Sequence, residues 1–222
     1  MDFFEDHVPT RARRYICTVI ATALPVLLFC VYETVTGAEP SWILLAALTA
    51  LANCFPLRIS IISEQIWITF DDAFVFLALI HFGPEVAVVV AAIEAVAFNL
   101  RKPTQLPYRA VFTIAQLVIA TFLAGHVLYR LLPNGLPLSL GGRVDSRLLV
   151  AALFGGALYF LMSSVMVSVA IANASQKPLL GIWKKILPGA LVTLAGAALA
   201  STLLLQWELD VVNRILDMDP RF

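Results

Sequence analysis

The sequence predicts an all-α polytopic membrane protein with about seven transmembrane helices, and two observations predict this class. First, 60% of the 222 residues are hydrophobic and 14% are charged, with a mean hydropathy of +0.89. A soluble domain of this size needs more polar surface to cover its core, whereas lipid solvates an apolar exterior. Second, the apolar residues form runs, several of which reach the roughly 20 residues that cross a bilayer.

Apolar runs determine the predicted helices. The run Phe70–Leu100 is too long for one straight span and is interrupted at Gly83-Pro84, where proline after glycine stops or sharply turns a helix. We therefore predict two short helices, Phe70–Phe82 and Pro84–Leu100, joined by a Gly-Pro turn. The other predicted spans are Tyr15–Thr36 (with a kink at Pro25), Ser41–Leu57, Tyr108–Leu132, Arg147–Asn173 and Leu187–Trp207.

The segment 57–70 differs from its surroundings because strand-forming residues dominate it. Ile59, Ile61 and Trp67 favour extended backbone, and Ser63-Glu64-Gln65 is typical of a turn between two short strands. We predict a small amphipathic β-hairpin over residues 57–70 at the membrane surface. An irregular loop is the alternative.

The distribution of charge orients the predicted helices. With the N-terminus in the cytoplasm, ten lysine and arginine residues of the N-terminal segment and the connections fall inside and three fall outside. Three regions follow from this topology. Residues 1–14 form a cytoplasmic segment, residues 15–207 form a single helical transmembrane domain, and residues 208–222 form a short amphipathic tail at the interface.

Polar residues at membrane depth are the candidate binding residues, because an ionisable group in lipid is costly and usually functional. Glu94 lies halfway along its predicted helix, where its carboxylate cannot easily reach the interface. Asn99 and, on the next long helix, Gln116 can share the same interior. For these residues, an interhelical hydrogen bond that only holds the bundle together is the alternative.

Two aspartates begin the third predicted helix, which we place at the inner face. One of them explains a helix cap, because a carboxylate accepts the free backbone N–H groups and complements the helix dipole. The second is one more than a cap needs. A polar contact with a ligand or partner stays open beside capping, and we assign Asp72 rather than Asp71 to the predicted binding site.

Enzyme and nucleic-acid motifs are missing from the sequence. It contains no Gly-x-Ser-x-Gly, no His-Glu-x-x-His and no phosphate loop, and its basic residues follow the membrane topology. His81, His126 and Glu85 are conceivable metal or haem ligands, but no third strong ligand accompanies the histidines. We therefore expect interfacial histidines, no catalytic activity, no metal or other cofactor, and no nucleic-acid partner.

Three short runs resemble the MASE-like N-terminal membrane input modules of bacterial signalling proteins. These runs are ITFDDAFVF (Ile68–Phe76), HFGPE (His81–Glu85) and RAVFTIAQ (Arg109–Gln116), the last similar to the group's Arg-x-x-Phe-Asn-x-x-Gln segment with Thr113 in place of asparagine. Such modules usually precede cytoplasmic GGDEF or HD-GYP domains, which make or degrade cyclic di-GMP. Here the chain stops at Phe222 without them, so a free-standing relative, a truncated product or a miscounted span stays open.

The resemblance implies an integral sensor of the bacterial inner membrane. As a hypothesis, it binds a small apolar or amphipathic ligand, or senses the membrane, around Asp72, Glu94, Asn99 and Gln116. Its implied partners are the lipid bilayer and either a second copy of itself or a cytoplasmic signalling output protein.

The Phe82-Gly83-Pro84 turn also resembles the substrate-binding S components of energy-coupling-factor vitamin transporters. In this chain, Val88–Val90 and Glu94 replace the glycines and the aspartate of their second helix. This alternative implies a binding subunit of a small-molecule transporter, with an ATPase partner.

Overall fold

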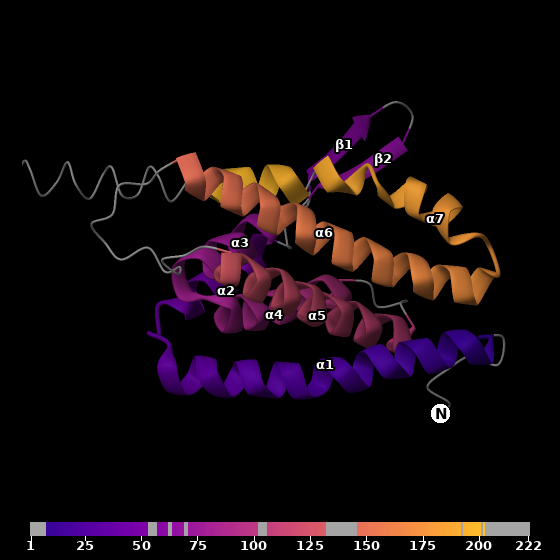
Figure 1. Cartoon of the computed structure of the whole chain (residues 1–222), viewed down its shortest axis with the longest axis horizontal. Helices are drawn as coiled ribbons and strands as arrows, with labels where there is room; N and C mark the ends of the chain where they lie inside the picture. Colours follow the sequence, from indigo (N-terminus) through magenta and orange to yellow (C-terminus); the bar gives the residue numbers. More distant parts are fainter. Residues whose placement is uncertain are drawn as a thin grey trace, which may run out of the picture.

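The computed structural model describes residues 8–52, 57–61, 64–68, 71–101, 106–131, 146–191, 193–200 and 202. Its long helices run side by side, and in the view of Figure 1 helices α4 and α5 lie between α1 and α6. The elements are α1 (Thr10–Gly37), α2 (Trp42–Ala52), β1 (Leu57–Ile61), β2 (Glu64–Ile68), α3 (Asp71–Phe82), α4 (Pro84–Leu100), α5 (Pro107–Leu131), α6 (Ser146–Ser175) and α7 (Leu179–Ile186), followed by a helix over Gly189–Ala200.

Helices α1, α5 and α6 are each long and apolar enough to cross a membrane. Helix α7 and the helix Gly189–Ala200 pass the same test together and are bent by 42°. Large apolar side chains point away from the bundle, such as Leu28 of α1 with 62% of its surface exposed. Lipid covers such surfaces without cost, and the chain is therefore a multi-pass membrane protein.

Seven spans are not established by these helices. Helices α2 and α3 have 11 and 12 residues, which corresponds to lengths of about 17 and 18 Å. A bilayer core is roughly 30 Å thick. By length and composition the described helices give three spans, or four with the bent pair. The seven predicted segments thus stay a prediction.

Most predicted boundaries agree with the structure, and three differ. Helix α4 matches its predicted range, and α3, α5 and α6 differ by at most two residues at either end. Helix α1 begins at Thr10, inside the predicted cytoplasmic segment. Helix α2 ends at Ala52, and Leu57, the predicted end of that span, lies in strand β1. The predicted tail 208–222 lies outside the described residues.

The last predicted span begins differently in the structure. Helix α7 starts at Leu179, eight residues before the predicted span, and the chain bends at Pro188 before the next helix. Pro188 has no backbone N–H to donate, and in a helix its ring would clash with the carbonyl four residues earlier, which explains a break here. The prediction of a span over 187–207 therefore missed the amphipathic helix α7, which comes directly before it.

Two five-residue antiparallel strands occupy the segment where we predicted a hairpin. Leu57 pairs with Ile68, and Ile61 pairs with Glu64. Glu64 and Gln65 are thus paired residues of β2, and their predicted place in the turn was wrong. Residues 62 and 63, which connect the strands, lie outside the described part of the chain.

Helix α4 is the central helix of the bundle and contacts α1, α2, α3 and α5. Its residues are apolar on nearly every side, which is the pattern of a helix with no solvent-facing surface. Val86, Val88 and Val90 are almost completely buried, and interspersed alanines allow neighbouring helices to approach closely. Glu94 therefore lies in the best-packed element of the fold.

Glycine is required where α5 meets the turn between α3 and α4. Gly83 has φ of +108°, a region that favours glycine, and Pro84 begins α4. A Cβ on Gly125 would lie 2.9 Å from Leu79 Cδ1 and 2.9 Å from Pro84 Cβ. One helical turn later, the Tyr129 hydroxyl donates a hydrogen bond of 3.3 Å to the Leu79 carbonyl. Helix α5 thus holds the turn in place.

Three contacts show which helix ends lie together. The Tyr15 hydroxyl donates to the Met166 carbonyl, the Tyr15 ring lies 6.3 Å from the Phe112 ring, and the Asn99 amide donates to the Ala110 carbonyl. The start of α1, the end of α4, the start of α5 and the C-terminal part of α6 therefore share one end of the bundle. Basic residues of this end are Arg11, Arg13, Arg14, Arg101, Arg109 and Lys177.

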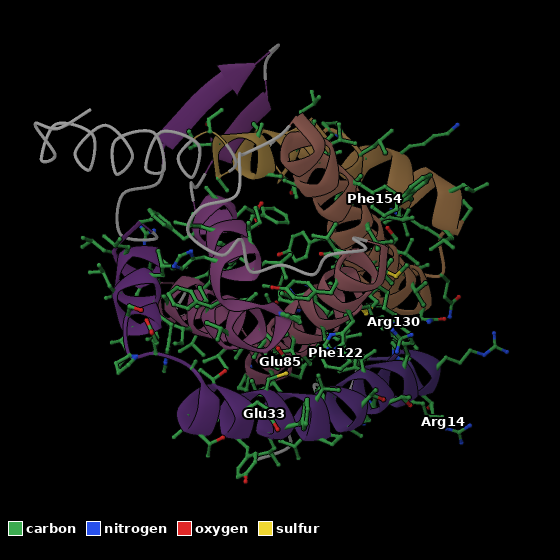
Figure 2. The ribbon with its side chains drawn as sticks, turned by 60° about the vertical axis from the view of Figure 1, so that its left-hand side comes forward. Arg14, Glu33, Glu85, Phe122, Arg130 and Phe154 are labelled. Carbon is green, nitrogen blue, oxygen red and sulfur yellow. The ribbon has the colours of Figure 1, made fainter. Side chains whose placement is uncertain are left out.

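Glu33 and Glu85 lie at the opposite end, together with Arg130 in the last turn of α5. Figure 2 shows Arg14 and Glu33 toward opposite ends of α1, with Glu85 on the neighbouring helix beside Glu33. The charge asymmetry predicted along the sequence is therefore also an asymmetry of the folded bundle.

Replacing Gly125 with alanine should lower the free energy of unfolding by about 1–3 kcal/mol, because the added methyl group overlaps Leu79 and Pro84. Titration of the detergent-purified protein with sodium dodecyl sulfate measures this change. Gly37→Ala is the matched control, since nothing lies within 4 Å of a Cβ there. Equal stability of both variants would contradict the close approach at Gly125.

Candidate functional site

The turn at Gly83 brings Asp72 and Glu94 to the same depth in the bundle. Asp72 lies eleven residues before Gly83, and Glu94 lies eleven residues after it. Helix α3 precedes this turn and helix α4 follows it, and the two helices pack against each other. At a rise of 1.5 Å per residue, both carboxylates lie about 16 Å from the turn, roughly half the thickness of a bilayer core.

A cavity of about 240 Å³ lies between the two carboxylates and the neighbouring helices. This volume is many times the roughly 10–15 Å³ that a single water molecule needs. Apolar side chains form one part of its wall: Ala95, Phe98, Leu117 and Phe160. Polar side chains from four helices form the other part: Asp72, Glu94, Tyr159, Ser163 and Thr193.

Hydrogen bonds tie the polar wall to the bundle. The Thr193 hydroxyl donates to Asp72 Oδ2 over 3.1 Å, and the Ser163 hydroxyl donates to Gln116 Oε1 over 2.9 Å. Gly196 makes the first contact possible, because a Cβ there would lie 3.1 Å from Asp72 Cβ. The cavity is therefore rich in oxygen acceptors, and its polar residues also connect helices that lie far apart in the sequence.

The four predicted site residues have different places in the structure. Asp72 and Glu94 line the cavity, and only 7% of the surface of Glu94 is exposed. Gln116 is buried beside the cavity and reaches it through Ser163. Asn99 does not line it; its amide donates to the Ala110 carbonyl over 3.1 Å and joins α4 to α5. For Asn99, the structure shows the interhelical hydrogen bond that is the alternative to a binding role.

Asp72 lies deeper than predicted. We placed the start of this helix at the inner face, but α3 has only 12 residues and begins about halfway through the bundle. Both aspartates still fall in the first turn of α3, where a cap belongs. The backbone of Asp71 is described, whereas its side chain lies outside the described part of the structure.

Sequence reasoning missed three polar residues of the cavity. Tyr159 and Ser163 are four residues apart on α6 and therefore lie on one helix face, which was a readable signal. Thr193 is a single hydroxyl in an apolar run, which has no periodicity to mark it. The equal spacing of Asp72 and Glu94 from Gly83 was a further signal that they meet.

His81 and His126 do not line this cavity. His126 Nε2 is 3.5 Å from Glu85 Oε1, while its Nδ1 is 3.0 Å from the Phe122 carbonyl oxygen. His81, the predicted neighbour of Glu85 on the sequence, is exposed and packs edge-on against Phe82. Within the described ranges, no group of three or more His, Cys, Asp or Glu residues could hold a metal ion.

An apolar helical bundle with polar side chains gathered around a cavity between its helices defines the class as multi-pass membrane proteins. The MASE9 family model matches residues 42–207, which is more than half of the chain. The chain therefore belongs to the MASE9 family, and it is a MASE-like membrane-associated sensory module. The match includes every residue of the cavity wall and begins after α1. Neither the curated proteins nor the solved structures contain a match to the chain.

Replacing Thr193 with valine should lower the free energy of unfolding by about 1–3 kcal/mol, because the Asp72 carboxylate loses a buried donor. The same detergent titration measures the loss. Thr36→Val is the matched control, since the Thr36 hydroxyl is exposed and donates within its own helix. Thr193→Val combined with Asp72→Ala should cost less than the sum of the two single changes. Strict additivity would show that the two side chains do not interact.

Proposed function

We propose that this chain is the sensory input module of a signalling pathway in the bacterial inner membrane, and that the cavity between Asp72 and Glu94 is its ligand site. The observation that carries the proposal is the pairing of two carboxylates at mid-membrane depth inside a cavity. Ionisable groups in such a position are expensive and are kept where they serve a function. Membership of the MASE9 family supports the sensory role.

The cavity wall indicates the chemical class of the ligand. Carboxylate, phenol and hydroxyl groups line the cavity together with the rings of Phe98 and Phe160. Oxygen acceptors recognise N–H or O–H donors, while aromatic rings accommodate an apolar portion. We therefore propose a small amphipathic ligand with a donor group at one end. Its size is limited by a volume below the roughly 300–1,000 Å³ of drug-sized sites.

Ligand binding has a route to the rest of the bundle. A donor group that contacts Asp72 competes with the Thr193 hydroxyl, and one that contacts Ser163 competes with its bond to Gln116. These bonds join α3 to the helix Gly189–Ala200, and α5 to α6. A ligand with different affinity for two arrangements of these helices shifts their populations. The proposed output is a contact with a cytoplasmic signalling protein or a second copy of the chain, without catalysis by this module.

The family match supports the resemblance to sensory modules and does not support the resemblance to transporter S components. The site itself is compatible with solute binding, and the two functions differ in partner. Co-purification with an ATPase-containing membrane complex would favour the transporter alternative.

Hexylamine, a small amphipathic amine, should raise the thermal unfolding temperature of the purified protein, and hexanoate should not. The ammonium group donates to the two carboxylates, whereas hexanoate is repelled by them. Asp72→Asn and Glu94→Gln should each weaken the stabilisation by hexylamine. Glu85→Gln is the control, because Glu85 is a carboxylate on the same helix outside the cavity. If hexylamine stabilised all of these variants equally, the cavity between Asp72 and Glu94 would not be its binding site.

The proposed topology places the N-terminus in the cytoplasm, together with the basic end of the bundle. Alkaline phosphatase is active only when exported, so its insertion after Glu39, in the connection from α1 to α2, should give active enzyme. Insertion after Gln176, in the connection from α6 to α7, should give inactive enzyme. The opposite pattern of activities would reverse the orientation.

A further inference from the structure

A groove lies at the end of α6, where the chain turns into α7. Gln176 has φ of +56°, and this left-handed residue turns the chain so that α7 packs back along α6. The Trp183 indole N–H donates to the Ser164 hydroxyl over 3.0 Å and fixes α7 in this position. The space between the helices has a volume of about 460 Å³.

The groove combines an apolar floor with basic side chains. Ile171 of α6 and Ile182 and Ile186 of α7 line it, together with Lys177 and Lys185. The sequence from residue 146 to residue 202 contains no aspartate or glutamate. The two ammonium groups therefore meet no acidic side chain from either of the helices that form the groove.

The groove lies where lipid headgroups and acyl chains meet. Helix α6 has 30 residues, a length of about 45 Å, which exceeds a bilayer core of roughly 30 Å. Its end therefore reaches the interface, at the basic end of the bundle. Helix α7 has no buried residue and carries its lysines in its last turn, the character of a helix lying in the interface plane.

We propose that this groove binds one anionic phospholipid, with an acyl chain along the isoleucines and the phosphate against Lys177 and Lys185. Free phosphate has no apolar part and leaves the floor of the groove unused. A zwitterionic lipid fills the floor but offers the lysines no net charge. An anionic lipid at the interface has both an acyl chain for the apolar floor and a negative charge for the two lysines.

This groove shares no lining residue with the polar cavity, and the proposal that it binds a lipid does not depend on the ligand proposed for the cavity. Both sites use residues of α6, where Ile171 of the groove follows Ser163 of the cavity by eight residues. Between them, Ser164 anchors α7 through Trp183 and is the chain neighbour of Ser163.

Native mass spectrometry of the full chain in detergent tests the proposal, with phosphatidylglycerol and phosphatidylcholine added in equal amounts. The expected result is preferential retention of one phosphatidylglycerol molecule. Lys177→Gln combined with Lys185→Gln should weaken its binding about 30-fold, since each lysine near an anionic headgroup contributes about fivefold. Lys184→Gln is the matched control, because Lys184 is exposed on the same helix but does not line the groove.

A second measurement uses Trp183, the chain neighbour of the groove residue Ile182 on α7, as a reporter. In a Trp42→Phe, Trp67→Phe, Trp207→Phe background, phosphatidylglycerol with brominated acyl chains should quench its fluorescence more than brominated phosphatidylcholine. The lysine double variant should lose this difference. Equal effects of Lys184→Gln and Lys185→Gln, equal binding of both lipids, or equal stabilisation by inorganic phosphate alone would each overturn the proposal.

Discussion

The reversal of the chain at Gly83-Pro84 is the constraint on which the rest of the bundle depends. Gly83 adopts a positive φ, and Pro84 starts α4 at once, so α3 and α4 leave the turn antiparallel and in contact. Gly125 leaves room for this turn on the neighbouring helix. Because each helix rises by the same amount per residue, the two carboxylates at equal spacing from Gly83 must arrive at the same depth.

Two carboxylates at that depth require polar neighbours, and this requirement explains the surrounding packing. An unsatisfied buried carboxylate costs several kcal/mol, so the bundle must bring donors to it. The Thr193 hydroxyl reaches Asp72 only because Gly196 allows its helix to approach α3 closely. Small residues in the last helix thus serve the polar site as well as the packing of the bundle.

Composition and apolar runs predicted the membrane class, the helix Pro84–Leu100 and a carboxylate at Glu94 within it, because a long apolar run and an isolated carboxylate are local signals. The polar partners Tyr159, Ser163 and Thr193 could not be predicted with equal force. A single hydroxyl in an apolar helix has no periodicity, and only the arrangement of helices shows which of them face a common cavity. Helix α7 was missed for a related reason, since a short amphipathic helix raises average hydropathy too little to be read as a span.

The bent pair formed by α7 and Gly189–Ala200 connects the membrane surface to the cavity. Trp183 ties its first helix to α6 at Ser164, and Thr193 ties its second helix to α3 at Asp72. The bend of 42° lies between these two attachments. A displacement of α7 along the interface must therefore either change the bend or strain the bond at Asp72. By the same geometry, a change in the hydrogen bonding of Asp72 acts on the helix that follows α7, so the proposed ligand and the proposed lipid would both act on this bent pair.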